Sequence, residues 1–346
     1  MHLRKQKTFH TNFMNIYFLL KLNQWTRSPF VKRLGIFMLH VTGKRYLGIF
    51  MDPVLACNLR CKMCHFSDPE KRKKMKGFFK KEELPKIANA LFHRALKLQI
   101  GCSAEPSLFQ YNKELILLGK QHKVPYISMT TNAILFSRDD WWELTQAGID
   151  EFTLSIHGVT KESYEYFMTG ASYEKFLAAM KILTSIKETY PKLKIRLNYT
   201  INKDNLEELQ TFFDTFGHYR FDILQLRPIL HLGDTVYQHF SWDEIYSRYD
   251  QIIEKLKKQC KDRAITCIAP GKRNLLREAR GNNPVVRMTY CNIKPHRIWR
   301  PDFNPDTDTF ESYAKKKQLS KTYFKNIFQL NKSAENETKL LNYEIN

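Results

Sequence analysis

The sequence predicts an α/β protein built as a partial (β/α)6 TIM-type barrel with a small C-terminal cap or extension. Three observations lead to this fold class: short apolar runs recur along the chain, amphipathic segments follow them, and polar motifs stand where the runs end. Alternating strands and helices favour a parallel sheet with right-handed crossovers, which places the chemistry at the carboxyl ends of the strands. Six such units are too few for a closed eight-stranded barrel.

The six strands are predicted from runs that are rich in β-branched or aromatic residues and bounded by polar, Gly or Pro positions. They span residues 46–55, 96–102, 126–131, 151–156, 194–201 and 221–229. Helices are predicted from apolar residues spaced three and four apart, at 82–95, 112–122, 139–147, 173–187, 204–216 and 242–258. A doubly wound open sheet has the same periodicity, so it remains an alternative architecture.

The chain divides into four parts by composition. Residues 1–45 form a basic N-terminal extension, and residues 46–230 contain the predicted core barrel. Residues 231–312 carry a C-terminal helix and a small cap, in which residues 290–302 are predicted to form a strand-and-turn unit. Residues 313–346 form a Lys/Asn-rich tail, which is expected to be a helix or frayed.

The chain is strongly basic, with 56 Lys and Arg against 35 Asp and Glu and a net charge of +21. Residues 1–50 contain no Asp or Glu. Such a charge favours polyanions such as nucleic acid, anionic lipid or phosphorylated substrates, but dispersed solvated charges would give the same composition. An apolar stripe within residues 13–22 fits either a helix packed on the barrel or a peripheral contact with a membrane surface.

The cysteines point to metal or redox chemistry. There are seven and no convincing secretion signal, which indicates a reducing, cytoplasmic location. Cys57, Cys61 and Cys64 follow the first strand with the spacing C-x3-C-x2-C. Three such thiolates suit a soft metal centre, and in a four-iron cubane they leave one iron open for a substrate or cofactor. A zinc site that includes His65 and purely structural cysteines remain the alternatives.

With this loop the chain resembles the radical S-adenosylmethionine (radical SAM) superfamily over about residues 45–230, and in particular members with a C-terminal SPASM or twitch-like extension. The resemblance implies an enzyme in which Cys57, Cys61 and Cys64 hold a 4Fe–4S cluster whose open iron binds S-adenosylmethionine. One electron then cleaves this cofactor into methionine and a 5′-deoxyadenosyl radical, which abstracts hydrogen from a substrate. It also implies a reduced flavodoxin- or ferredoxin-type electron donor.

Further strand-end motifs are similar to those of the family. Glu105 stands in a turn that resembles the family's Gly-Gly-Glu-Pro, with bulkier residues in place of the usual glycines, and is expected to bind the cofactor's ammonium group. Thr131 matches a Thr-Asn-Gly motif and is expected near the cofactor's carboxylate or ribose. Ser155 matches a Ser-φ-Asp-Gly motif and is expected at the ribose or methionine end, while His157 replaces the motif's common Asp.

Three further residues extend the expected cofactor site. Arg196 lies two positions before Asn198, where related enzymes have a basic residue that reaches the cofactor's carboxylate; an outward, solvated side chain is the alternative. Arg227, at the end of the sixth strand, is expected to contact substrate or cofactor. Met63 stands where many members have an aromatic residue and is expected to cover the adenine with its polarizable thioether.

The C-terminal part is less informative about the substrate. Cys260, Cys267 and Cys291 are either ligands of an auxiliary iron–sulfur cluster or ordinary buried thiols. The final reaction is open, with a peptide or a small molecule favoured as substrate. An RNA-modifying member of the superfamily is the alternative that the charge supports. A non-enzymatic scaffold or sensor that binds a metal or cluster is the alternative from another class.

Overall fold

The computed structural model describes residues 26, 28–229, 235, 237, 241–271, 275, 284–328 and 343–345. The strands are β1 (Leu47–Met51), β2 (Ala95–Ile100), β3 (Ile127–Thr131), β4 (Glu151–Ile156), β5 (Lys194–Ile201), β6 (Ile223–Pro228), β7 (Thr266–Pro270), β8 (Tyr290–Lys294), β9 (Arg297–Ile298) and β10 (Tyr343–Ile345). They form one ten-stranded sheet in the order β10-β7-β6-β5-β4-β3-β2-β1-β8-β9. From β7 through β1 to β8, every pair of neighbouring strands is parallel. The edge strands β10 and β9 pair antiparallel with β7 and β8, respectively.

Helices cover the outer face of the sheet. The α-helices are α2 (Pro29–Val41), α3 (Pro69–Lys74), α4 (Glu83–Leu91), α5 (Asn112–Gln121), α6 (Arg138–Gln146), α7 (Lys161–Phe167), α8 (Tyr173–Thr189), α9 (Phe212–Phe216), α10 (Asp243–Asp262), α11 (Pro284–Thr289), α12 (Phe310–Lys316) and α13 (Leu319–Phe328). The 3-10 helices are η1 (His65–Ser67), η2 (Phe92–Arg94), η3 (Pro106–Leu108) and η4 (Glu207–Thr211). Among the described residues, none of the helices combines the length and apolar character needed to cross a membrane.

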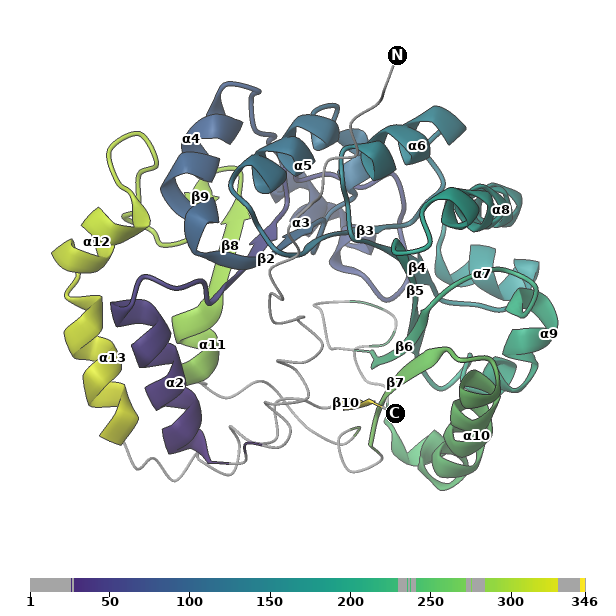
Figure 1. The fold of residues 1–346 in the computed structure, drawn as a ribbon. Helices are drawn as coiled ribbons and strands as arrows, with labels where there is room; N and C mark the ends of the chain where they lie inside the picture. The colour runs from purple at the N-terminus through teal and green to yellow at the C-terminus, as the bar shows by residue number, and fades with distance from the viewer. Residues whose placement is uncertain are drawn as a thin grey trace, which may run out of the picture.

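The strand order confirms the barrel-type winding and excludes the doubly wound alternative. Strands β1 to β7 follow one another across the sheet without a reversal, whereas a doubly wound sheet reverses its order at a switch point. Figure 1 shows the sheet as an open arc with helices α4 to α10 on its outer side. The six predicted strands are β1 to β6, and the structure is therefore a partial barrel with additional strands at both edges.

The two faces of the sheet differ in polarity because side chains alternate along each strand. On β1, the fully buried Leu47, Ile49 and Met51 alternate with half-buried residues and pack under the helices. The inner face carries polar contacts between neighbouring strands: Gln99 Nε2 on β2 donates to Thr130 Oγ1 on β3 at 3.1 Å. The hydrophobic core thus lies between sheet and helices, and the inner face is left for polar chemistry.

Several boundaries differ from the prediction for local reasons. Strand β1 ends at Met51, four residues early, because Pro53 lacks an N–H and restricts the residue before it. The helix predicted at 204–216 is split into η4 and the short α9. Helix α2 was not predicted, although Ser28 caps it and Pro29 opens it, which is a known start signal. The predicted stripe at 13–22 lies outside the described residues.

The C-terminal residues do not all form a separate cap. The strand-and-turn unit predicted at 290–302 is confirmed as β8 and β9, but β8 pairs in parallel with β1 and so extends the main sheet. Strand β7 extends the opposite edge by pairing with β6. The tail contains a helix, α13, which packs against α2 beside α11, as Figure 1 shows at its lower left.

Candidate active site at the carboxyl ends of the strands

The loop that carries Cys57, Cys61 and Cys64 begins where β1 ends. It is fixed by backbone hydrogen bonds to the segment at the end of α7: Arg60 N donates to Thr169 O and Lys62 N to Phe167 O, both at 2.9 Å. Within the loop, Leu59 N donates to Cys57 Sγ at 3.4 Å and Cys64 N donates to Cys61 O at 2.9 Å. These contacts hold the backbone of the cysteine loop in a defined conformation at the carboxyl end of β1.

The three thiols suit a metal cluster by their chemistry. They are half-buried and none is in a disulfide. Burial raises the pKa of Cys57 to about 11 and the pKa of Cys61 well above its usual range, so without a metal these groups stay protonated. Among the described residues no three Cys, His, Asp or Glu side chains converge on one ion position. A cubane needs no such convergence, because each thiolate binds a different iron.

Asp52 connects this loop to the turn after β2. The buried Asp52 Oδ1 accepts hydrogen bonds from Cys102 N at 2.6 Å and Ser103 N at 2.9 Å, while Ser103 Oγ donates to Asp52 Oδ2 at 2.6 Å. Gly101 makes this approach possible with a φ of +73°, since a Cβ there would lie 2.4 Å from the Thr130 carbonyl oxygen. Sequence reasoning missed Asp52; an acidic residue at a strand's carboxyl end was the available signal.

Glu105 is the centre of a buried network, together with the predicted Thr131. Its carboxylate accepts from Thr131 Oγ1 at 2.6 Å, from Asn132 N at 2.8 Å and from Ser107 Oγ at 2.7 Å. Burial raises the pKa of Glu105, and these donors oppose that effect. The Thr131 hydroxyl is thus engaged by Glu105, and it also accepts from Ala133 N at 3.0 Å. Thr131 positions Glu105 in this structure.

The loops after β1, β2 and β3 are joined to one another. Asn132 Nδ2 donates to Asn58 Oδ1 at 2.8 Å, and Asn58 directly follows Cys57. Glu105 N donates to Ala56 O at 2.9 Å. The predicted cysteines, Glu105 and Thr131 are therefore brought together by direct contacts between three strand ends.

Ser155 and Asn198 lie next to each other on β4 and β5, where they are register partners. Asn198 is buried, and its Oδ1 atom has no hydrogen-bond partner among the described residues, so it can accept a hydrogen bond from a ligand. Met63 is buried beside the end of β5, where its thioether accepts from Asn202 Nδ2 at 3.0 Å. That contact ties the cysteine loop to β5.

Arg196 lies apart from the polar residues that surround the cysteine loop. It lies three positions into β5, toward the amino end of the strand, and its Nε and Nη2 atoms donate to the two oxygens of Glu151, each at 2.9 Å. Its Nη1 donates to Gln225 Oε1 at 2.8 Å. Burial alone would raise the pKa of Glu151, but Arg196 outweighs it and holds that pKa at about 2. The structure thus pairs the guanidinium with this chain's own carboxylate.

His157 and Arg227 follow at the ends of β4 and β6. Burial lowers the pKa of His157 to about 4, helped by the nearby Arg227 charge, so the imidazole is neutral near pH 7. His157 Nδ1 donates a hydrogen bond to the Ile156 carbonyl oxygen at 2.7 Å. Because Nδ1 carries the proton in the neutral ring, Nε2 is left as an acceptor. His157 replaces the acid of the family motif with a neutral group.

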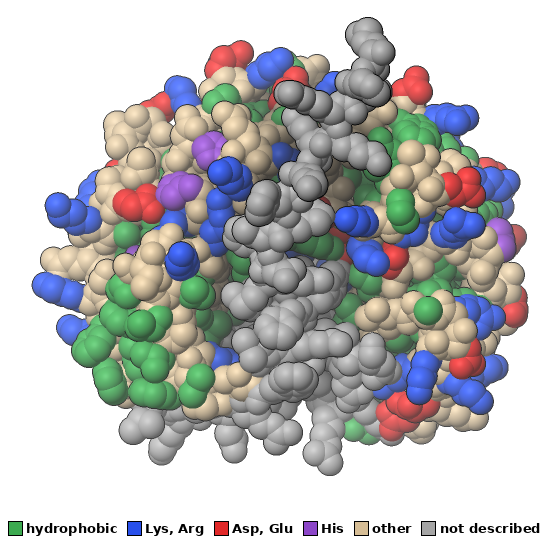
Figure 2. All heavy atoms as spheres, in the orientation of Figure 1, with side chains coloured by type: hydrophobic (Ala, Val, Ile, Leu, Met, Phe, Trp, Pro, Cys, Tyr) green, Lys and Arg blue, Asp and Glu red, His purple; other side chains and the backbone are tan. Residues whose placement is uncertain are grey.

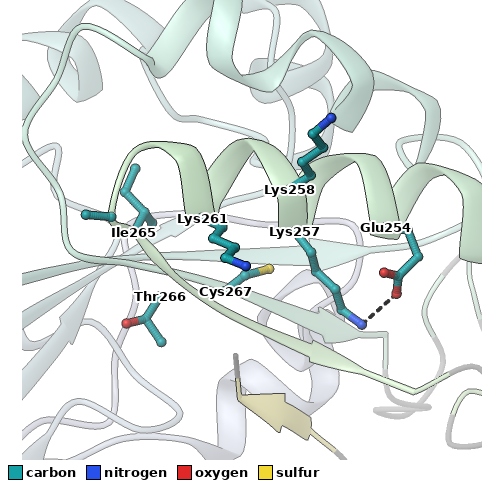
Figure 3. A pocket seen from close by; sticks show the side chains of 8 residues that line it. Glu254, Lys257, Lys258, Lys261, Ile265, Thr266 and Cys267 are labelled. Atoms are coloured by element: carbon teal, nitrogen blue, oxygen red, sulfur yellow. Dashed lines mark hydrogen bonds and ion pairs between the residues drawn. The ribbon is translucent and has the colours of Figure 1, made fainter.

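The structure does not bring the three C-terminal cysteines together. Cys260 on α10 and Cys267 on β7 are buried neighbours, whereas Cys291 lies on β8 at the opposite side of the sheet. Cys267 lines a groove of about 690 Å³ between α10 and β7, in which Lys257 is paired with Glu254 at 2.9 Å (Figure 3). Of the two alternatives for these cysteines, the structure favours ordinary buried thiols, because the three side chains do not form one set of cluster ligands.

The fold and the cysteine loop define a class of protein, and comparison with known proteins agrees. Residues 51–216 match the Radical SAM superfamily, so this part of the chain is a radical SAM domain. The superfamily uses a 4Fe–4S cluster and S-adenosylmethionine, and the three thiols of the β1 loop are the groups suited to hold that cluster. A SPASM extension is not among the matches.

The individual relatives found for this chain have low sequence identity to it. A probable GTP 3′,8-cyclase of Saccharolobus islandicus is 26% identical over 212 residues, which cover 59% of this chain and 64% of the relative. Another, of Sulfurisphaera tokodaii, is 24% identical over 213 residues, 60% of this chain and 61% of the relative. The chain therefore spans less than two thirds of these relatives.

Solved structures share the fold. SuiB of Streptococcus suis, bound to S-adenosylmethionine, has a TM-score of 0.57 at 16% identity and covers 72% of this chain and 58% of that one. The enzyme anSMEcpe with bound AdoMet has a TM-score of 0.51 at 18% identity, over 64% of this chain and 60% of that one. At these identities the similarity concerns the fold alone.

Proposed function

We propose that this enzyme cleaves S-adenosylmethionine reductively beside the β1 loop and directs the resulting radical at an anionic small molecule held on the inner face of the sheet. The observation that carries the first half is the joined set of loops after β1, β2 and β3. Through Asp52 and Asn132, the cysteine loop and the Glu105 turn share hydrogen bonds, so that cluster ligands and cofactor ligands keep one relative position.

The polar groups around the cysteine loop suit the parts of S-adenosylmethionine. A buried Glu105 whose pKa is raised gains most from a cationic partner, and the methionine ammonium is one. The unpartnered Asn198 Oδ1 and the neighbouring Ser155 suit the ribose hydroxyls. When bound, the 4Fe–4S cluster supplies the electron for carbon–sulfur cleavage, received from a reduced flavodoxin- or ferredoxin-type protein.

The proposal that the substrate is an anion is based on two cationic side chains on the inner face of the sheet. Lys97 on β2 and Arg227 on β6 both lie near enough to Cys102 to influence its thiol. The Glu151 carboxylate, already paired with Arg196, also favours the Lys97 charge, but burial outweighs it. Burial lowers the pKa of Lys97 to about 8, which shows that its charge is poorly compensated, so a bound anion would stabilise the charged form. The relatives named GTP 3′,8-cyclase act on a nucleoside triphosphate, which has this charge.

The cleavage is tested by measuring 5′-deoxyadenosine formed by anaerobically reconstituted protein with dithionite and S-adenosylmethionine. We expect nucleoside from the wild type, none from Cys61→Ala, and a normal amount from Cys267→Ala, which removes a cysteine outside the β1 loop. No nucleoside from wild-type protein with a fully loaded cluster would refute the proposal and favour a scaffold or sensor.

The substrate class is tested by binding of GTP and guanosine to the reconstituted protein. GTP is expected to bind roughly 100-fold more tightly than guanosine, because two cations would contact the phosphates and each contact is worth about 1.4 kcal/mol. Lys97→Ala and Arg227→Ala should each remove about tenfold of that difference, and Lys181→Ala, on the outer helix α8, none. Equal binding of the two ligands would show that the inner-face cations serve another purpose.

A further inference from the structure

A surface at one edge of the fold is unusually apolar. Of the fourteen exposed large hydrophobic side chains among the described residues, eight lie on three helices that pack against one another. We call this surface the α2/α13 face; it consists of Phe30, Val31, Leu34, Met38 and Val41 of α2, Val286 of α11, and Phe324 and Phe328 of α13. Each of these side chains is between 37% and 59% exposed. Monomeric soluble proteins seldom gather exposed apolar side chains in this way.

The α2/α13 face is continuous. The rings of Phe30 and Phe328 lie 6.1 Å apart, and those of Phe324 and Phe328 lie 5.3 Å apart. Figure 2 shows the hydrophobic side chains as one green area at the lower left, where Figure 1 draws α2 and α13, and no acidic side chain interrupts it. Scattered surface residues would not give this arrangement.

The helices beneath this face are firmly held. Arg33, buried on the opposite side of α2, donates from Nη1 to the Asn326 carbonyl oxygen of α13 at 2.9 Å. His40 of α2 shares a hydrogen bond of 3.0 Å with Ser320 of α13. The exposed apolar side chains therefore belong to a preformed surface, and a partner does not have to order the helices first.

The charges on these helices have one sign. Helices α2, α11 and α13 contain no Asp or Glu. Lys321 and Lys325 are exposed, and they share a face of α13 with Phe324 and Phe328, because residues three and four apart lie on the same side of a helix. The chain that precedes α2 also lacks acidic residues.

We propose that the α2/α13 face binds the surface of an anionic lipid bilayer. Phe and Met side chains suit the boundary between headgroups and acyl chains, and flanking lysines suit anionic headgroups. Pairing of two copies through this face would bring the lysines of both copies together without an acidic partner, which disfavours self-association. The proposal does not depend on the enzymatic reaction.

The test is flotation of the full-length protein with vesicles of phosphatidylcholine alone and of phosphatidylcholine with 30% phosphatidylglycerol. We expect strong binding to the anionic vesicles, weak binding to the neutral ones, and weakening with salt. Phe324→Ser with Phe328→Ser should reduce binding at least tenfold. Lys321→Glu with Lys325→Glu should reduce it at least 25-fold, since each basic residue near such a surface contributes about fivefold.

Matched controls show that the α2/α13 face itself is responsible. Leu117→Ser on α5 and Lys181→Glu on α8 change similarly exposed residues elsewhere and should leave binding within twofold. Circular dichroism of each variant checks that it is folded. The proposal is overturned if anionic vesicles are not bound, if the face variants bind as well as the controls, or if sedimentation shows a dimer that the face variants abolish.

Discussion

Replacing Glu151 with glutamine tests whether Arg196 serves the fold or the cofactor. Glu151 lies at the start of β4 and Arg196 on β5, and their two-pronged ion pair is almost wholly buried. Tyr126 Oη also donates to Glu151 at 2.6 Å. The variant Glu151→Gln keeps the size of the side chain but leaves the Arg196 charge without its counter-ion.

The magnitude follows from the pKa of Glu151, which is about 2 in the folded protein against an ordinary value of 4.5. The difference between these two pKa values corresponds to roughly 3 kcal/mol of folding free energy. Breaking a buried pair by removal of one partner costs about 3–5 kcal/mol, which agrees. Because the folded pKa is depressed, this stability is present above pH 4.5 and is lost as the pH falls toward 2.

The assay is urea-induced unfolding of both proteins at several pH values. We expect the free energy of unfolding of Glu151→Gln to be about 3 kcal/mol lower at pH 7, with the difference narrowing below pH 4.5. Glu143→Gln, which removes an exposed ion pair with Lys113, should cost less than about 1 kcal/mol. A cost below 1 kcal/mol for Glu151→Gln, together with altered S-adenosylmethionine binding, would show that Arg196 serves the cofactor.

Three other substitutions probe the site. Asp52→Ala leaves the Cys102 and Ser103 N–H groups without an acceptor, so we expect a loss of about 3–5 kcal/mol in unfolding free energy; Asp52→Asn, which keeps one acceptor, should lose less. Gly101→Ala should weaken S-adenosylmethionine binding at least tenfold in a titration, because its Cβ would displace the Glu105 turn; unchanged binding would contradict this. Since the pKa of Lys97 is about 8, anionic-substrate binding should weaken as the pH rises through 8 in the wild type but not in Lys97→Arg, as measured by the dissociation constant.

The core of the candidate site could be predicted because its signals are local. The three cysteines lie within eight residues, and Glu105 stands in a recognisable turn. What the sequence does not contain is the partner of each polar group. Asp52 accepts a hydrogen bond from the Cys102 N–H, 50 residues away in the sequence. Asn58 accepts one from the Asn132 side chain, 74 residues away. Side-chain direction and pairing across such separations depend on strand register, which periodicity alone does not specify.

Arg196 illustrates the same limit. Alternation along β5 predicts that Arg196 shares a face with Asn198, but it does not say which face points inward. The position of Arg196 beside Glu151 depends on how β4 and β5 are paired. Similarly, the spacing of Cys260, Cys267 and Cys291 permits a cluster. Only the sheet order, with β7 and β8 on opposite sides, separates Cys291 from the other two.

By itself, the sequence determined the alternation of strands and helices, the cysteine loop and the strand-end motifs, because each depends on residues that are close in the chain. The tertiary structure decided which strands are neighbours, that β8 extends the sheet beside β1, and that Asp52 holds the Glu105 turn. It also decided that α2 buries Arg33 and His40 against neighbouring elements and leaves its apolar stripe exposed. These features depend on contacts between distant segments, whose geometry exists only once the sheet has formed.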